Sequence, residues 1–510
     1  MADTSCRFSW LAERKAGVLL HPSSLPGPYG IGTIGATAHA FVDYLSESKI
    51  GYWQILPLGP TGFGNSPYSA YSVFAGNQLL IDLNVFLDAG HLTYDELAPL
   101  AELPVDRIDF NFLQAIHAPV LRLAHERFKM RGLAYIGNFG RLVDFRKKHA
   151  DWLEPYALFM ALKRAHGGAA WMDWPEEWAD YERASRAKKP EHIVLEQELH
   201  IFVQYIFWGQ WGALHSFAKE RNVEIIGDLP IYASGDSADT WANRSIFCLD
   251  ENGRGTEVAG VPPDYFSETG QLWGNPVYNW DELAKDDFEW WMRRLEQNFA
   301  LCDVIRLDHF RAFFDYWAVP ADAPDARSGV WKDGPQHAFF KALKKRFGAG
   351  ARIIAEDLGE LNDDVRNFID KLGFPGMSIL QFAFDGEDNS NVFLPHYAAT
   401  NMVVYPGTHD NDTTLGWYQS ISPETKDQLR RYFRITGDEI TWDFIRASYS
   451  SPSRLCVFAM QDILSLDSSA RMNVPGMASG NWEWRMTYTQ FEEARTSAAY
   501  LSELAWLYGR

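Results

Sequence analysis

The 510-residue sequence has few cysteines and no long apolar run. Cys6, Cys248, Cys302 and Cys456 are far apart and form no C-x-x-C pair, so they indicate neither a zinc site nor a disulfide framework. The first six residues lack a basic start and a long apolar stretch, and no apolar run approaches membrane-spanning length. These absences predict a cytoplasmic protein, in a reducing compartment, that does not associate with a membrane.

Basic residues are scarce relative to acidic ones. The chain has 47 Lys and Arg against 67 Asp and Glu, which gives a net charge of −20. Binding of nucleic acid requires a basic surface, so this balance excludes a polyanionic partner and remains compatible with a neutral substrate. A Gly-rich motif that could cradle phosphate is also absent, and we expect no organic cofactor.

Aromatic residues, in contrast, are abundant. They make up 15 % of the chain and include 20 Trp. Flat aromatic faces suit the apolar faces of sugar rings, but a large aromatic core is an equally good explanation for any single Trp. Composition alone leaves these two interpretations open.

Acidic residues follow short apolar runs at four places in the chain. These are residues 224–228 (EIIGD), 303–310 (DVIRLDHF), 352–357 (RIIAED) and 402–412 (MVVYPGTHDND). Because side chains alternate along a strand, Arg306 and Asp308 point the same way, and the cation keeps the neighbouring carboxylate ionised. A buried structural ion pair would have the same pattern.

The order of elements predicts an α/β protein with a (β/α)₈ TIM barrel fold. The predicted strands are residues 17–21, 52–58, 224–228, 303–308, 352–356, 377–381, 402–405 and 455–458. We expect a single catalytic barrel over residues 1–510, with a mainly helical insertion at 91–222 between strands 2 and 3. A second, loop-rich insertion at 230–300 separates strands 3 and 4, and its stretches 260–267 and 271–276 have the composition of a lid.

Asp308, Glu356 and Asp410 would meet at one end of such a barrel, where these enzymes build their sites. Three carboxylates suggest cleavage of a glycosidic bond, in which one attacks, one protonates the leaving oxygen and one supports the charged transition state. Acids at strand ends also bind Mg²⁺ or Mn²⁺. The cation of Arg306 already occupies this face, so we expect no metal.

Several motifs, in order along nearly the whole chain, carry a family resemblance. They are residues 65–68 (NSPY), 227–231 (GDLPI), 260–266 (GVPPDYF), 306–309 (RLDH), 355–359 (AEDLG), 407–412 (GTHDND), 470–476 (ARMNVPG) and 480–482 (GNW). The chain resembles the 4-α-glucanotransferases, the amylomaltase or disproportionating-enzyme family of the α-amylase clan.

The resemblance implies a role for each matching residue. Asp308 would be the nucleophile, Glu356 the general acid and base, and Asp410 the stabiliser of the transition state. Further residues are implied to contact the glucan: Arg306 and His409 at the cleavage point, and Tyr68, Asp264, Phe266, Trp273, Asp385 and Asn473 nearby. Adjacent residues of a regular strand face opposite ways, so Asp357, next to Glu356, is predicted to be a structural acid.

The resemblance also implies the reaction. A retaining double displacement would transfer a segment of an α-1,4-glucan, such as a maltooligosaccharide or a fragment of starch or glycogen, to the 4-hydroxyl of another glucan or of glucose. Two alternatives remain open at this point. One is an α-glucan hydrolase of the same clan, and the other is a non-catalytic glucan-binding protein.

The loop at residues 261–266 (VPPDYF) is predicted to control whether water or a sugar accepts the glucan. Its prolines stiffen it and its aromatic side chains can stack on an incoming sugar. We expect Phe266→Ala to lower turnover and raise the hydrolysed share of the products, about tenfold for each ~1.4 kcal/mol of lost acceptor stabilisation. Free glucose and reducing ends released from maltotriose measure this, and an unchanged ratio would exclude the loop from this role.

Overall fold

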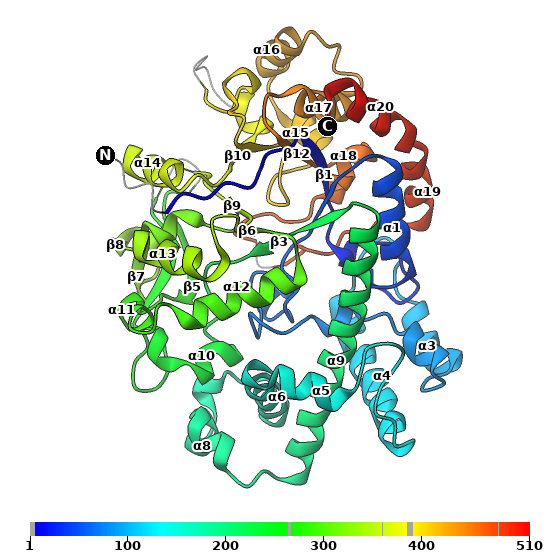
Figure 1. Cartoon of the computed structure of the whole chain (residues 1–510), viewed down its shortest axis with the longest axis vertical. Helices are drawn as coiled ribbons and strands as arrows, with labels where there is room; N and C mark the ends of the chain where they lie inside the picture. Colours follow the sequence, from blue (N-terminus) through cyan, green and yellow to red (C-terminus); the bar gives the residue numbers. More distant parts are fainter. Residues whose placement is uncertain (1–5, 264–266, 360, 385–390, 478) are drawn as a thin grey trace.

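The computed structural model of the protein describes residues 6–263, 267–359, 361–384, 391–477 and 479–510 (Figure 1). Eight parallel strands form its central sheet: β1 (Lys15–Leu19), β2 (Tyr52–Gln54), β3 (Glu224–Leu229), β6 (Val304–Leu307), β9 (Ile353–Ala355), β10 (Gly376–Ile379), β11 (Met402–Tyr405) and β12 (Leu455–Ala459). Their order is β10-β11-β12-β1-β2-β3-β6-β9. The predicted (β/α)₈ barrel is confirmed.

The barrel strands are short apolar runs that are buried along nearly their whole length. Parallel strands covered on both faces read as continuous apolar sequence, which is why the pattern predicted each of them. The second strand is shorter than predicted, because residues after Gln54 leave the parallel ladder that joins β2 to β1 and β3. Inside the barrel, Tyr405 donates a hydrogen bond to Oε1 of Gln54 (2.9 Å).

The barrel closes at a joint between β9 and β10, the two ends of the strand order. The N–H of Ala355 donates to the carbonyl of Pro375 (2.9 Å), and the N–H of Met377 donates to Oδ1 of Asp357 (2.7 Å). A side chain at Gly376 would collide with the same carboxyl group. The structural role predicted for Asp357 is confirmed.

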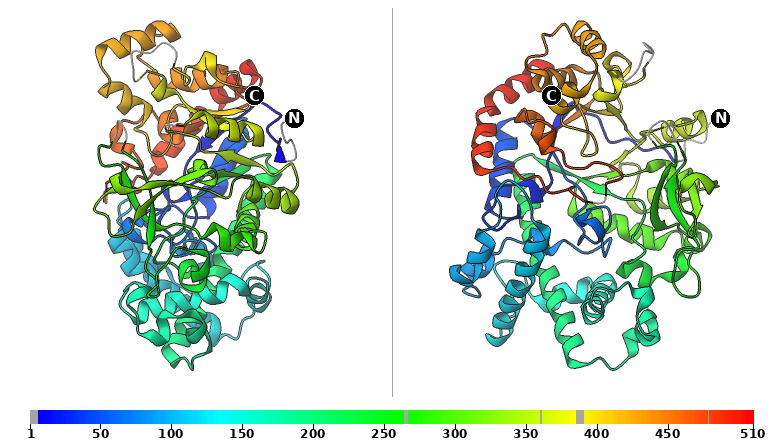
Figure 2. Two further views of the ribbon diagram at one scale, coloured as in Figure 1. Left: turned by 90° about the vertical axis from the view of Figure 1, so that its left-hand side faces the viewer. Right: turned by 180° about the vertical axis from the view of Figure 1, so that it is seen from behind.

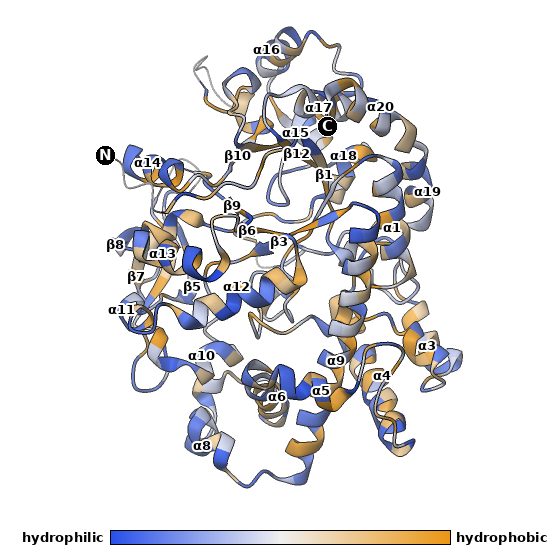
Figure 3. Ribbon diagram, in the orientation of Figure 1, coloured by the Kyte–Doolittle hydropathy of each residue, from blue (hydrophilic) through white to orange (hydrophobic). Residues whose placement is uncertain are grey.

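Helices lie around the barrel and in the segments that connect its strands, and Figure 3 shows hydrophilic and hydrophobic segments along several of them. They are α1 (Ala36–Glu47), α2 (Asn84–Asp88), α9 (Glu191–Glu220), α10 (Ala238–Ala242), α11 (Trp280–Ala284), α12 (Glu289–Leu301), α13 (Gln336–Phe347), α14 (Asp363–Leu372), α15 (Thr414–Ser420), α16 (Pro423–Phe433), α17 (Ile440–Ser450), α18 (Met460–Ile463), α19 (Tyr488–Thr496) and α20 (Ala498–Tyr508). Within the described ranges, none has both the length and the apolar character needed to cross a membrane.

The first and last helices of the barrel lie side by side (Figures 1 and 2). The hydroxyl groups of Tyr44 in α1 and Ser497, just before α20, are 3.0 Å apart. Segments from both ends of the sequence therefore complete one helical layer.

The segment predicted to be a helical insertion is helical and forms the lower end of the molecule in Figure 1. It contains α3 (Tyr94–Ala101), α4 (Phe110–Met130), α5 (Leu142–Lys148), α6 (Ala150–Ala165), α7 (Glu176–Ala179), α8 (Tyr181–Arg186) and α9. The end of α9 belongs to the barrel layer, because Trp211 donates to the carbonyl of Leu301 (2.8 Å) and His215 contacts Asp303 (2.9 Å).

A four-stranded antiparallel sheet lies beside the barrel. It consists of β5 (Gln271–Pro276), β4 (Glu257–Val261), β7 (Asp315–Pro320) and β8 (Val330–Asp333), in that order. The prediction that residues 271–276 form a loop was wrong. This edge strand exposes Leu272 and Trp273 and ends among Gly and Pro, so it lacks the buried alternation that identifies a strand.

Most of the tryptophans are buried in the core or packed against it. The largest fully buried side chains include Trp53, Trp171, Trp211, Trp241 and Trp291. Trp273, in contrast, is 37 % exposed. The aromatic composition therefore reflects mainly core packing, and only particular positions are available to a sugar.

A substitution at Asp357 tests how much the joint between β9 and β10 contributes to the stability of the protein. Asp357→Ala removes the acceptor of the buried Met377 N–H, and we expect the free energy of unfolding to fall by about 1–3 kcal/mol. Asp357→Asn is the matched control, because it keeps the Oδ1 acceptor at the same position. Urea unfolding of both variants measures the difference. Equal stability of the Ala and Asn variants would contradict the closing role.

Candidate active site

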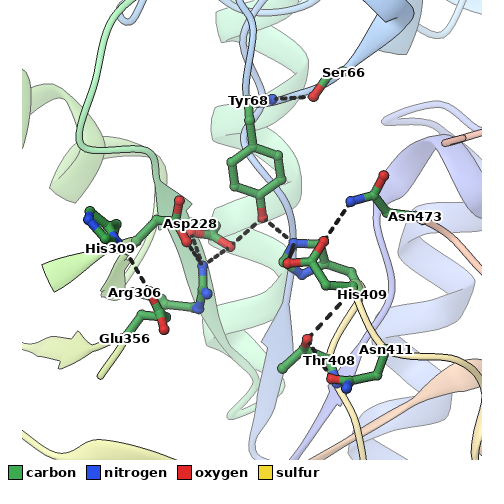
Figure 4. Close-up of polar contacts among 12 residues, drawn as sticks. Ser66, Tyr68, Asp228, Arg306, His309, Glu356, Thr408, His409, Asn411 and Asn473 are labelled. Atoms are coloured by element: carbon green, nitrogen blue, oxygen red, sulfur yellow. Dashed lines mark hydrogen bonds and ion pairs between the residues drawn. The ribbon is translucent and has the colours of Figure 1, made fainter. Parts of the chain in front are cut away.

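Four acidic residues meet at the carboxyl end of the barrel, and Figure 4 labels two of them, Asp228 and Glu356. Asp228 lies in β3, Asp308 follows β6 directly and Glu356 follows β9 directly. Asp410 lies in the loop after β11. The register of the sheet pairs Asp228 with Arg306, which places the charged ends of β3 and β6 side by side.

Arg306 connects two of these carboxylates. Its Nη1 donates to both oxygens of Asp228 (2.8 Å each) and to Oδ1 of Asp308 (3.0 Å). Burial acts to lower the pKa of Arg306, but Asp228 and Asp308 outweigh it and raise that pKa well above its ordinary value. Arg306 thus remains charged, and its hydrogen bond orients the more exposed carboxylate of Asp308.

Glu356 is held by two backbone groups. The N–H of His309 donates to Oε2 and the N–H of Leu358 donates to Oε1, each at 2.8 Å. Burial raises the pKa of Glu356 to about 7, while Arg306 lowers it and Asp308 raises it further. Glu356 is therefore half protonated near neutral pH, as a group that first donates and later accepts a proton requires.

Tyr68 lies between Asp228 and His409 (Figure 4). Its hydroxyl donates to Oδ2 of Asp228 (2.8 Å) and is 2.8 Å from Nε2 of His409. Since the hydroxyl has one proton, Nε2 of His409 carries its own and donates to the Tyr68 oxygen. The rings of Tyr68 and His409 also stack at 5.2 Å, and Trp482 packs against both.

Two buried glutamines of α9 hold the loop that carries Tyr68. Gln204 accepts from the N–H of Gly76 (2.7 Å) and donates to its carbonyl (2.8 Å). Gln210 does the same with Asp82, at 2.9 Å for each bond. Each side-chain amide pairs with the N–H and the carbonyl of one loop residue, as a neighbouring strand would. Helix α9 therefore fixes one wall of the site.

Asp410 is oriented by the segment before α19. Nδ2 of Asn473 donates to Oδ1 of Asp410 (2.6 Å), and Nη2 of Arg471 donates to its carbonyl (2.6 Å). Arg471 also donates to the carbonyl of Asn473 (2.8 Å). Nε2 of His409 lies 3.5 Å from Oδ2 of Asp410. Arg471 therefore holds the backbone of both Asp410 and Asn473, whose side chains are hydrogen-bonded to each other.

Two cavities flank the cluster. One is lined by Tyr68, Asp228 and Tyr232. The other is lined by His21, His409 and Arg471. The site thus has space beside its charged residues.

The structure brings together eight of the residues predicted to form the site: Asp308, Glu356, Asp410, Arg306, His409, Tyr68, Asn473 and Trp273, the last of which contacts His309 with ring centroids 4.9 Å apart. Asp264, Phe266 and Asp385 lie outside the described residues.

Three contributors to the site were not assigned a role from the sequence. Asp228 and Trp482 belong to matched motifs, as does Arg471. Their functions become visible only through contacts with Arg306, His409 and Asp410. In the part of the chain that the structure describes, no group of three or more His, Cys, Asp or Glu is arranged to hold a metal ion.

A carboxylate held by arginine, facing a carboxyl group that titrates near neutrality at the top of a (β/α)₈ barrel, is the arrangement of an enzyme that cleaves glycosidic bonds. A family model described as 4-alpha-glucanotransferase matches residues 20–490. The chain belongs to this family.

Individual relatives agree. The chain is 45 % identical over 481 residues to a 4-alpha-glucanotransferase of Thermus thermophilus, covering 93 % of this chain and 95 % of the relative. It is 44 % identical over 504 residues to one of Synechocystis, covering 98 % and 99 %. The amylomaltase from Streptococcus agalactiae in complex with acarbose superposes with a TM-score of 0.91 at 35 % identity, covering 98 % of this chain and 100 % of that one. The enzyme is a glycosyltransferase that acts on α-1,4-glucans, as predicted.

The pKa of Glu356 predicts how activity depends on pH. The leaving oxygen needs a proton, so kcat/KM for maltooligosaccharides should fall about tenfold per pH unit above about pH 7, where Glu356 loses its proton. We expect Glu356→Gln to lower activity on natural glucans by roughly 10²–10⁴-fold but still to react slowly with a donor whose leaving group needs no proton. Rates on both donors across pH 5–9 test this. Equal losses on both would remove Glu356 from the acid role.

Proposed function

We propose that this 4-α-glucanotransferase works by a retaining double displacement in which Asp308 attacks, Glu356 transfers protons and Asp410 stabilises the transition state. The observation that carries this proposal is the contrast between two neighbouring carboxyl groups. Arg306 lies 3.0 Å from Asp308, whereas burial raises the pKa of Glu356 to about 7. One group is suited to attack and the other to donate a proton.

In the first step Oδ of Asp308 forms a bond to the anomeric carbon while Glu356 protonates the departing glycosidic oxygen. The electron pair of the broken bond stays on that oxygen, which leaves as the 4-hydroxyl of the released fragment. Positive charge develops on the ring, and Asp410 lies on the same face of the barrel to stabilise it. Arg306 and His409 contact the sugar at this point.

In the second step Glu356, now ionised, removes a proton from the incoming 4-hydroxyl. The acceptor oxygen attacks the anomeric carbon and releases the carboxylate of Asp308, so the α configuration is restored. The acceptor is a glucan chain or glucose. Transfer requires that the acceptor is bound and water is kept from the intermediate, because bulk water would otherwise compete.

Tyr68, Trp273 and Asn473 form the described part of the proposed glucan contacts. Trp273 offers an exposed aromatic face at the site, and Tyr68 and Asn473 lie beside His409 and Asp410. Asp264, Phe266 and Asp385 complete the proposal from the sequence alone. The similar amylomaltase from Streptococcus agalactiae was solved in complex with acarbose, which supports a glucan-binding site here.

The single-barrel organisation, with insertions at 91–222 and 230–300, is also part of the proposal. We further propose a cytoplasmic enzyme that binds no nucleic acid or membrane and needs neither metal nor organic cofactor. The acidic charge balance and the widely spaced cysteines support the first statement. The absence of a metal is supported by Arg306, whose cation already pairs with the acids of the cluster.

The nucleophile is tested by Asp308→Asn. The amide is nearly isosteric but cannot form the glycosyl ester, so we expect transfer from maltotriose to fall by at least roughly a thousandfold. The thermal unfolding midpoint should change little, since Arg306 keeps its two contacts to Asp228. Sizing the maltotriose products gives the readout. Substantial transfer by a folded Asp308 variant would overturn the assignment.

A further inference from the structure

We propose that His309 is a positioning residue for Glu356, because its left-handed backbone holds the carboxyl group in the orientation and hydrogen-bonded state that proton transfer requires. This inference rests on the proposed role of Glu356 as general acid. His309 follows Asp308 directly, so a single turn serves both carboxylates.

The backbone of His309 has an uncommon conformation. Its φ is 47° and its ψ is 51°, in the left-handed region that residues other than Gly rarely adopt. Its N–H donates to Oε2 of Glu356 (2.8 Å), and the next N–H, of Phe310, donates to the carbonyl of Glu356 (3.1 Å). Successive N–H groups of an extended chain point in opposite directions. The left-handed turn at His309 therefore allows the N–H groups of His309 and Phe310 to donate to the same residue, Glu356.

The donated hydrogen bond affects protonation as well as orientation. With Leu358 bound to Oε1 and His309 bound to Oε2, both oxygens of Glu356 accept a backbone N–H. Such bonds favour the ionised carboxylate: the bond from Leu358 lowers the pKa of Glu356, against the larger effect of burial, which raises it. Losing the His309 donor should therefore raise that pKa further.

The imidazole of His309 has a separate function. It packs edge-on against Trp273, with an interplanar angle of 85°. Burial lowers the pKa of His309 to about 4, so the ring is neutral while Glu356 titrates. The ring supports Trp273, and the backbone supports Glu356.

Other charged groups around Glu356 come from several elements. Arg306 and Asp308 lie at the end of β6, and Asp357 follows Glu356 itself. Asp228 of β3 contacts Arg306 and Tyr68, and Tyr68 contacts His409 (Figure 4). His409 in turn lies beside Asp410 of the loop after β11. A substitution at His309 leaves all of these side chains in the protein.

The test compares His309→Val with His309→Asn in the full-length enzyme. Val is β-branched and disfavours the left-handed region, whereas Asn tolerates it. We expect the alkaline limb of kcat/KM for maltooligosaccharides to move up by about one pH unit in the Val variant, corresponding to a tenfold change in proton affinity. The ratio of activity on natural glucans to that on a donor needing no proton should also fall roughly tenfold. The Asn variant should keep the wild-type limb.

Unfolding midpoints establish that each variant is folded, and His309→Ala replaces Val if Val is not, with a smaller shift in the same direction. A folded Val or Ala variant with the wild-type limb and donor ratio would overturn the positioning role. Glu356→Gln separates the two proposals. If it loses both donors equally, the acid assignment fails, whereas a donor-selective Glu356→Gln with an unaffected His309→Val refutes only the inference about His309.

Discussion

The site depends on one buried cation. Arg306 is 3 % exposed, and its Nη1 is shared between Asp228 and Asp308. Burying a guanidinium without an acidic partner costs free energy, so Asp228 is needed to keep Arg306 buried. The same positive charge also attracts the carboxylate of Asp308. Tyr68 and His409 extend the same network through Asp228. The electrostatic surroundings of Asp308 are therefore set by a cation two residues away from it.

Around this cation, rigid supports come from distant parts of the chain. Gln204 and Gln210 of α9 fix the loop of Tyr68, and Arg471 fixes Asp410 together with Asn473. Each of these three side chains hydrogen-bonds to backbone carbonyl or amide groups rather than to flexible side chains. Geometry held in this way is available before the substrate arrives, which is the condition for electrostatic stabilisation of a transition state.

Much of the architecture could be predicted from the sequence, because buried parallel strands are local apolar runs. The acids at their ends identified Asp308, Glu356 and Asp410 for the same reason. The pairing of Arg306 with Asp228 was not predictable, since it joins residues 78 positions apart through the register of β3 and β6. The antiparallel sheet was missed because its strands come from separate segments, and its edge strand β5 exposes Leu272 and Trp273.

The joint between β9 and β10 has a consequence for how the barrel opens. Among the described residues, parallel ladders connect the other neighbouring strands, whereas this joint relies on the Ala355–Pro375 bond and the carboxyl group of Asp357. Local opening has the lowest free energy where backbone bonds are fewest, so amide hydrogen exchange should begin here. Glu356 follows β9 at this joint, so local opening of the barrel should displace Glu356 before the other acids of the site.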